Sequence, residues 1–109
     1  MQPKSQLIAD EVLEQNPSTI LDVGYAQEVN PFLNEKGAKV FGVDIVSKPA
    51  PYDKTFICDL NTDKLPFDDE SIDAVAMGCT LAHIANPLKA MADINRVLKK
   101  GGGSRRLIT

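Results

Sequence analysis

The sequence predicts an α/β domain built on a mostly parallel sheet of about five strands. Short aliphatic segments alternate with amphipathic or polar segments along the 109 residues. Residues 18–24 and 38–44 resemble two strands with a short helix between them, all within about thirty residues, which is the size of a unit with two parallel strands. These observations place the chain in the α/β class.

Composition and charge fit a single small domain that spans residues 1–109. The chain is 43% hydrophobic and 25% charged, and its net charge is -3. This acidic balance argues against nucleic-acid binding as the main role. No apolar run reaches the length of a membrane span, and the polar start of the chain does not resemble a signal peptide, so we expect no membrane partner.

The chain has two cysteines and one histidine. Cys58 and Cys79 lie inside or at the end of apolar runs, and we expect two buried, reduced thiols in a cytoplasmic protein. With His83 they make no plausible zinc site, and we expect no metal.

The first predicted elements are a helix over residues 5–15 and a strand over residues 18–24. Apolar residues recur at helical spacing in the first segment, and Asn16-Pro17 ends it. The second segment, STILDVG, is aliphatic and β-branched, as expected for a strand that is buried on both faces.

A second helix and a second strand are predicted next. Asn30 can cap the first free amides of a helix, Pro31 is tolerated at its first position, and Gly37 is the expected stop. Residues 38–44, AKVFGVD, follow as the second strand.

Two more strands are predicted further along the chain. After a proline-containing loop at residues 47–53, residues 54–59 (KTFICD) form the third strand and residues 72–77 (IDAVAM) form the fourth. The connection between them is polar apart from an apolar plug, Leu65-Pro66-Phe67.

An amphipathic helix and a short strand complete the pattern. Residues 87–99 carry one apolar stripe, formed by Leu88, Met91, Ile94, Val97 and Leu98. Lys99 and Lys100 suit the negative end of the helix dipole, and the glycine triplet at residues 101–103 is the expected stop. Residues 105–109 (RRLIT) can begin a fifth strand.

Five segments between residues 18 and 109 resemble, in order, the motifs of class I S-adenosylmethionine-dependent methyltransferases. They are ILDVG, GVDI, CDLN, LPFDDESIDAVAMG and LAHIANPLKAMADINRVLKKGGG. The resemblance implies a Rossmann-like, three-layer α/β/α sandwich with S-adenosylmethionine as cofactor. It also implies methyl transfer to an acceptor, which we expect to be a small molecule or a glycan.

Acids at the ends of the predicted strands suit a nucleoside site. In open parallel sheets, ligands lie beyond the carboxyl ends of the strands. Asp44 ends the second strand about 20 residues after Gly24, and a carboxylate there can accept two hydrogen bonds from a ribose diol. Ile45 can pack on an adenine face.

The resemblance assigns three further residues to the cofactor. Asp59 and Leu60 lie where the family meets the adenine amino group, and Asp22 supports the glycine loop and the methionine end of the cofactor. Each of these acids also has a structural interpretation as a cap, and for Asp59 that interpretation is an Asx turn with Asn61.

The loop after the first strand departs from the family pattern of three alternate glycines, which map to Gly24, Ala26 and Glu28. Ala26 narrows the loop by one methyl group. Glu28 suits the start of a helix but repels the pyrophosphate of a dinucleotide. S-adenosylmethionine carries a sulfonium and an ammonium but no phosphate, so we interpret the loop as a modified S-adenosylmethionine site. Tyr25 either covers the cofactor or fills an apolar gap.

His83 is the candidate catalytic residue, because it resembles the histidine that follows the fourth strand in many relatives, near the substrate. The alternative is an exposed or capping histidine. Ala82 stands where relatives often have an acid, so the acid–base dyad of those relatives is not reproduced.

The family normally continues with two more strands after the fifth, so we expect a domain that is incomplete at its C-terminus relative to the family. An exposed fifth strand invites pairing, and we expect a homodimer through that edge. Two functions stay open: a methyltransferase, or a degenerate, non-catalytic module for binding or interaction. Another Rossmann-like nucleotide binder is disfavoured by the charge of Glu28.

Overall fold

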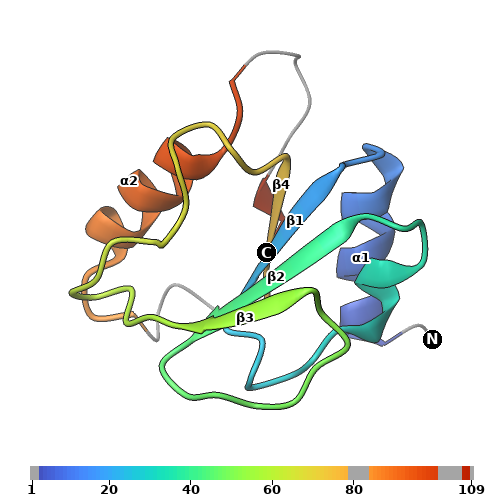
Figure 1. The fold of residues 1–109 in the computed structure, drawn as a ribbon, viewed down its shortest axis with the longest axis horizontal. Helices are drawn as coiled ribbons and strands as arrows, with labels where there is room; N and C mark the ends of the chain where they lie inside the picture. Colours follow the sequence, from blue (N-terminus) through green and yellow to red (C-terminus); the bar gives the residue numbers. More distant parts are fainter. Residues whose placement is uncertain (1–2, 79–83, 101–106, 109) are drawn as a thin grey trace.

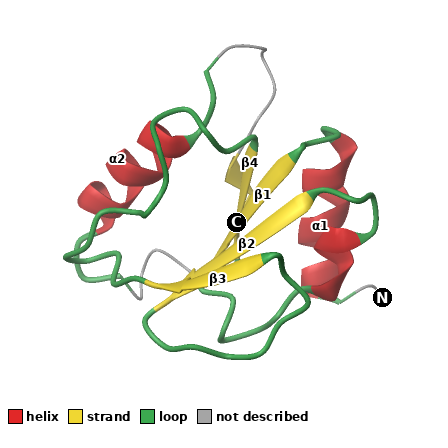
Figure 2. Cartoon of the chain, in the orientation of Figure 1, coloured by secondary structure: helices red, strands yellow, loops and turns green. Residues whose placement is uncertain are grey.

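A computed structural model describes residues 3–78, 84–100 and 107–108 of the chain. The ribbon is drawn in Figures 1 and 2. The elements in chain order are helix α1 (Lys4–Glu14), strand β1 (Thr19–Val23), the 3-10 helix η1 (Pro31–Asn34), strands β2 (Lys39–Asp44), β3 (Lys54–Ile57) and β4 (Ala74–Met77), helix α2 (Pro87–Val97) and strand β5 (Leu107–Ile108).

The five strands form one parallel sheet in the order β3-β2-β1-β4-β5. Helix α1 covers one face of the sheet and helix α2 covers the other (Figure 1). The predicted α/β class and the three-layer, Rossmann-like sandwich are therefore confirmed. The order of the strands reverses between β1 and β4, and sheets of this kind bind ligands at the carboxyl ends beside such a point.

The core has two apolar layers, because successive side chains of each strand point to opposite faces of the sheet. The layer under α2 contains Leu21, Val23, Val43, Val75, Met77, Ile94 and Val97. The layer under α1 contains Ile8, Val12, Ile20, Val40, Ala74 and Ala76. Burial on both faces explains why the central strands are almost continuously apolar in sequence.

The helix expected after Asn30 is a single 3-10 turn, η1. Asn30 caps it as predicted, and its side-chain oxygen accepts a hydrogen bond from the Phe32 N–H at 3.2 Å. The segment between Asn30 and Gly37 is too short for an α-helix, since the hydrogen bonds of so few residues do not offset the cost of nucleation.

Helix α2 differs from its prediction at both ends. Leu98 is extended, with ψ at 134°, so the helix stops at Val97 before it reaches the glycine triplet. Lys99 pairs with Asp73 at 3.2 Å instead of lying at the helix end. Leu88 is 84% exposed, because it lies about 120° around the helix from the buried Ile94 and so falls outside the buried arc.

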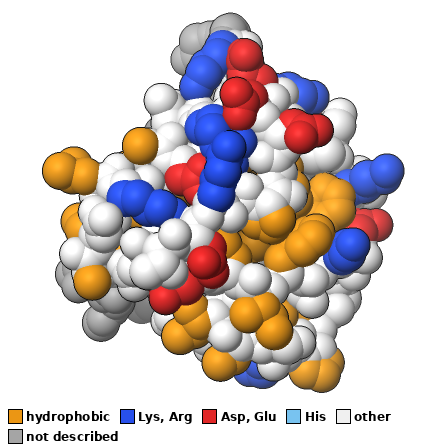
Figure 3. All heavy atoms as spheres, turned by 60° about the vertical axis from the view of Figure 1, so that its left-hand side comes forward, with side chains coloured by type: hydrophobic (Ala, Val, Ile, Leu, Met, Phe, Trp, Pro, Cys, Tyr) orange, Lys and Arg blue, Asp and Glu red, His pale blue; other side chains and the backbone are white. Residues whose placement is uncertain are grey.

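The structure also bears on the cysteines and the surface. Cys58 is a buried free thiol, as predicted, and Cys79 lies outside the described residues. Acidic and basic side chains are interspersed on the face that Figure 3 shows. Within the described ranges, no helix is long and apolar enough to cross a membrane.

Candidate functional site

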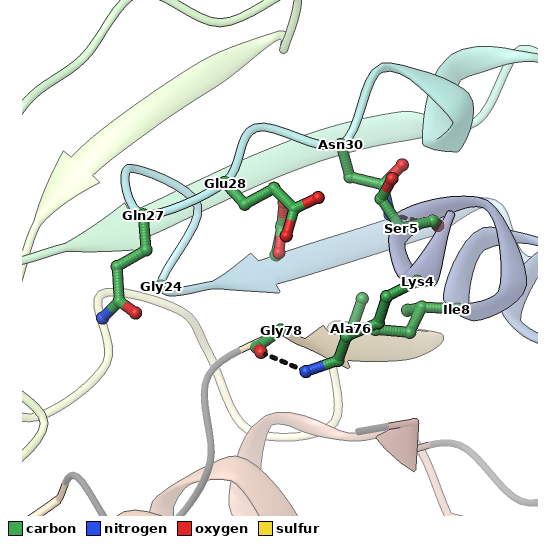
Figure 4. A pocket seen from close by; sticks show the side chains of 10 residues that line it. Lys4, Ser5, Ile8, Gly24, Gln27, Glu28, Asn30, Ala76 and Gly78 are labelled. Atoms are coloured by element: carbon green, nitrogen blue, oxygen red, sulfur yellow. Dashed lines mark hydrogen bonds between the residues drawn. The ribbon is translucent and has the colours of Figure 1, made fainter. Parts of the chain in front are cut away.

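Two cavities open at the carboxyl ends of the strands, beside the point where the strand order reverses. The first has a volume of about 200 Å³ and lies between the start of α1 and the ends of β1 and β4; Lys4, Asp22, Glu28, Asn30 and Gly78 contribute to its lining (Figure 4). The second has a volume of about 120 Å³ and lies beyond β2 and β3; Asp44, Ile45, Asp59, Leu60 and Ile84 contribute to its lining. Gly24 and Gln27 line both cavities, so the two adjoin at the loop after β1.

The predicted cofactor residues divide between these cavities. Asp22 lines the first, Gly24 lines both, and the second is lined by Asp44, Ile45, Asp59 and Leu60. Tyr25 and Ala26 line neither cavity. His83, the candidate catalytic residue, lies outside the described residues. The structure therefore brings together six of the predicted cofactor residues at one edge of the sheet.

The carboxylate of Asp44 holds the loop after β1. Its Oδ2 accepts a hydrogen bond from the Ala26 N–H at 3.1 Å, and its Oδ1 accepts one from the Ile45 N–H at 2.6 Å. Each carboxylate oxygen has a second lone pair, so the group keeps acceptor capacity for a ligand diol. The contact with Ala26 couples the end of β2 to the loop that separates the two cavities.

The altered glycine loop keeps a backbone that its residues tolerate. Gly24 has a φ of 79°, a left-handed conformation that favours glycine. Ala26 and Glu28 have no such positive φ, so the loop does not require glycine at either position. Glu28 therefore changes the chemistry of the cavity wall, and neither departure from the family pattern strains the backbone.

The two interpretations of Asp59, a turn cap and a residue of the cofactor site, are compatible in the structure. Its Oδ1 accepts a hydrogen bond from the Asn61 N–H at 2.9 Å, which is an Asx turn. The partly exposed side chain also lines the second cavity. The turn fixes the acid at the end of the third strand without removing it from the site.

Tyr25 fills a gap under the loop. Its side chain is only 1% exposed, and its hydroxyl accepts a hydrogen bond from the Lys48 N–H at 3.1 Å. Its ring meets Tyr52 edge-on at 5.8 Å between ring centroids. Gly42 lies beneath both rings, where an added Cβ would lie 2.7 Å from Tyr25 Cδ1 and 3.1 Å from Tyr52 Cδ2. Of the two alternatives for Tyr25, the structure shows packing in an apolar gap.

Asp22 is a buried acid at the base of the first cavity. Its Oδ2 accepts a hydrogen bond from the Tyr52 hydroxyl at 2.5 Å, and this hydroxyl also accepts one from the Asn30 N–H at 2.9 Å. Burial raises the pKa of Asp22 to about 7; the Tyr52 hydrogen bond opposes this rise, and the charges of Glu28 and Asp44 add to it. Burial and the charge of Asp22 raise the pKa of Tyr52, so its hydroxyl stays protonated as the donor.

Sequence reasoning missed Tyr52 and Lys4. Tyr52 lies in a segment predicted only as a loop, and no local pattern marks its contact with β1. Lys4 belongs to the first turn of α1, and its Nζ donates a hydrogen bond to the Gly78 carbonyl at 3.0 Å, which joins α1 to the end of β4 (Figure 4). A polar residue ahead of the apolar spacing of the helix was the one available signal for Lys4.

The arrangement fits the chemistry of S-adenosylmethionine. Acids that line the cavities suit a ligand with positive groups and a ribose diol, whereas the carboxylates of Asp22 and Glu28 disfavour a pyrophosphate in the first cavity. In the described part of the chain, no three His, Cys, Asp or Glu side chains are grouped to hold a metal ion.

Comparisons with known proteins agree with this geometry. A family model described as a methyltransferase domain matches residues 21–104. A demethylmenaquinone methyltransferase of Clavibacter sepedonicus is 47% identical over 38 residues, which cover 35% of this chain and 16% of that protein.

Two solved structures share the fold. The 1,6-didemethyltoxoflavin-N1-methyltransferase of Burkholderia thailandensis, with bound 1,6-didemethyltoxoflavin and S-adenosylhomocysteine, has a TM-score of 0.72 and 18% identity over 90% of this chain and 48% of that one. The MccD protein has a TM-score of 0.70 and 24% identity over 87% of this chain and 49% of that one. This chain thus spans about half the length of the structures it matches. Because the family model covers most of its length, the chain belongs to the class I S-adenosylmethionine-dependent methyltransferase family.

Proposed function

We propose that this chain binds S-adenosylmethionine and serves as the cofactor-binding part of a methyltransferase that acts on a small-molecule or glycan acceptor. The observation that carries the proposal is the pair of adjoining cavities at the carboxyl ends of the parallel strands, lined by Asp22, Asp44 and Asp59. Their acids match a cofactor that carries positive charge and a ribose diol.

Each cavity would take one part of the cofactor. Asp44 would accept hydrogen bonds from the ribose, Ile45 and Leu60 would pack against the adenine, and Asp59 would meet its amino group. Asp22 and Glu28 would face the positively charged methionine end. When bound, the cofactor supplies an electrophilic methyl group on sulfur, and the protein contributes by holding that group in line with the acceptor.

The relatives support a small acceptor. Two of them are named for demethylmenaquinone and for 1,6-didemethyltoxoflavin, both small molecules. His83 stays our candidate for a residue on the acceptor side. The alternative proposal, a degenerate domain without catalysis, rests on Ala26, Glu28 and Ala82, and of these Ala26 and Glu28 do not distort the backbone of the loop.

The proposal is tested by titrating S-adenosylmethionine into isotope-labelled protein while the backbone amide shifts are followed, with NADH as the control. We expect shifts at Gly24, Asp44, Ile45 and Asp59 with S-adenosylmethionine and much weaker effects with NADH. No shifts at millimolar S-adenosylmethionine would overturn the proposal in favour of an interaction module. Equal shifts with NADH would point to a general nucleotide binder.

A further inference from the structure

The wall of the first cavity carries a carboxylate that the glycine pattern of the family does not supply. Glu28 lines this cavity together with Asp22. In Figure 4 its side chain extends toward the cavity from the loop after β1. Its charge also acts on Asp22, because it contributes to the raised pKa of that acid. Two acids, one buried and one exposed, therefore act on the same small volume.

The cofactor of a methyltransferase and the product formed from it differ in charge. S-adenosylmethionine has a positively charged sulfonium, whereas S-adenosylhomocysteine has a neutral thioether at the same position. The ammonium, carboxylate, ribose and adenine are common to both molecules. A fixed negative charge near the sulfur therefore stabilises the cofactor relative to the product, and the stabilisation of the shared groups cancels in the comparison.

We propose that Glu28 is a specificity-determining residue that, with Asp22, shifts the preference of this cavity toward the sulfonium cofactor and away from its neutral thioether product. The inference rests on the proposed function, because it assumes that S-adenosylmethionine binds here. Its consequence is weaker inhibition of the protein by its own product than a glycine at position 28 would give.

The other charged groups around the cavity are the same in the wild type and in a variant changed only at position 28, so a comparison of the two isolates the charge of Glu28. Lys4 is the basic residue of the lining, and its Nζ is engaged by the Gly78 carbonyl at 3.0 Å. Asp44 adds a third negative charge, which also contributes to the raised pKa of Asp22. Because Glu28 is exposed, solvent and salt screen its charge, and the expected effect is several-fold rather than a hundred-fold.

The test is a pair of dissociation constants measured by calorimetry for S-adenosylmethionine and S-adenosylhomocysteine. For Glu28→Gln we expect binding of the first to weaken about five-fold and binding of the second to change by less than about two-fold. The matched control is Glu35→Gln, which makes the same change at an exposed residue of η1's C-terminal end that lines neither cavity. This control should leave both constants unchanged. Sinefungin, an analogue with an amine in place of the sulfonium, should follow S-adenosylmethionine.

Four outcomes would overturn the inference. Equal weakening of both ligands would mean that Glu28 acts on the shared ammonium. Two unchanged constants would mean that the charge of Glu28 is fully screened, and equally tighter binding of both ligands would mean that its side chain obstructs the cavity. Wild-type protein that binds neither ligand would overturn the proposed function and this inference with it. If the wild type binds both ligands and Glu28→Gln leaves the ratio of the two dissociation constants unchanged, the inference alone is overturned.

Discussion

Among the described residues, each face of the sheet buries one aspartate, and the two have different partners. Asp93 of α2 is 8% exposed, accepts a hydrogen bond from the Leu65 N–H at 2.6 Å and pairs with Arg96 Nε at 2.8 Å. Asp22 of β1 is 4% exposed and accepts a hydrogen bond from a neutral hydroxyl, that of Tyr52. No ion pair of Asp22 with a lysine or arginine occurs among the described residues. The comparison separates an acid that is paired within the scaffold from an acid that has no cationic partner among the described residues.

Arg96, the ion-pair partner of Asp93, makes several further contacts with the scaffold. Its Nη1 donates to the Phe67 carbonyl at 2.9 Å, and its Nη2 donates to the Leu65 carbonyl at 3.0 Å. A further contact joins Nη1 to Asp69 at 2.8 Å. The guanidinium and Asp93 together fasten the apolar plug of the β3–β4 connection to α2.

The largest expected effect follows from removing this cation. Arg96→Met leaves the Asp93 carboxylate buried without its main partner, and we expect the free energy of unfolding to fall by about 3 kcal/mol, measured by urea denaturation. Lys89→Met is the matched control, because Lys89 lies 3.9 Å from the same carboxylate at a more exposed position, and its loss should cost less than about 1 kcal/mol. Equal costs for the two variants would contradict the scaffold role of the Arg96–Asp93 pair.

At Asp22 we expect the opposite effect on stability, because here it is the charge of the carboxylate that destabilises the folded state. The pKa of Asp22 rises from 3.8 to about 7 on folding, so between these pH values the folded state binds a proton that the unfolded state has released. The contribution of Asp22 to the free energy of unfolding should therefore fall as the pH rises from about 4 to about 7.

Asp22→Asn removes this pH dependence while it keeps an acceptor for Tyr52. We expect the variant to be more stable than the wild type by roughly 1 to 3 kcal/mol at pH values above 7, as urea denaturation at acidic and basic pH would show. A variant that is less stable than the wild type under basic conditions would show that the carboxylate is compensated after all.

The smallest effect on stability is expected for Tyr52→Phe. The change removes the hydrogen bond that lowers the pKa of Asp22 and also the acceptor of the Asn30 N–H, at a cost of about 1 kcal/mol. The titration midpoint of Asp22, followed by carboxyl carbon NMR, should move above 7. Tyr25→Phe is the control, because the Tyr25 hydroxyl bonds to the Lys48 N–H and not to the acid. An unmoved midpoint in Tyr52→Phe would contradict the role of that hydroxyl.

The sequence predicted the sheet well, and it placed Asp44 and Asp59 at the strand ends where the second cavity lies. Strands that are buried on both faces are visible as aliphatic runs, and Asp44 and Asp59 were found because they directly follow such runs. Position along the chain then implies position in space, since the carboxyl ends of parallel strands share one edge.

The rest depends on contacts between distant loops. Tyr52 reaches Asp22 and Asn30, which lie 30 and 22 positions away in the sequence, and no periodicity encodes such a contact. The missing cation at Asp22 was not visible either, because pairing is decided by the whole neighbourhood of a side chain. Leu88 was misplaced for a simpler reason, since apolar spacing alone does not say how wide the buried arc of a helix is.

Gly42 carries a consequence for how this site can evolve. Any side chain at position 42 meets the rings of Tyr25 and Tyr52 together, so it requires that the rings shift or that one of the two residues becomes smaller. If Tyr52 were replaced by a smaller residue, Asp22 would lose its hydroxyl partner. Positions 25, 42 and 52 are therefore expected to covary among relatives, and a packing constraint on β2 would be inherited together with the protonation of an acid on β1.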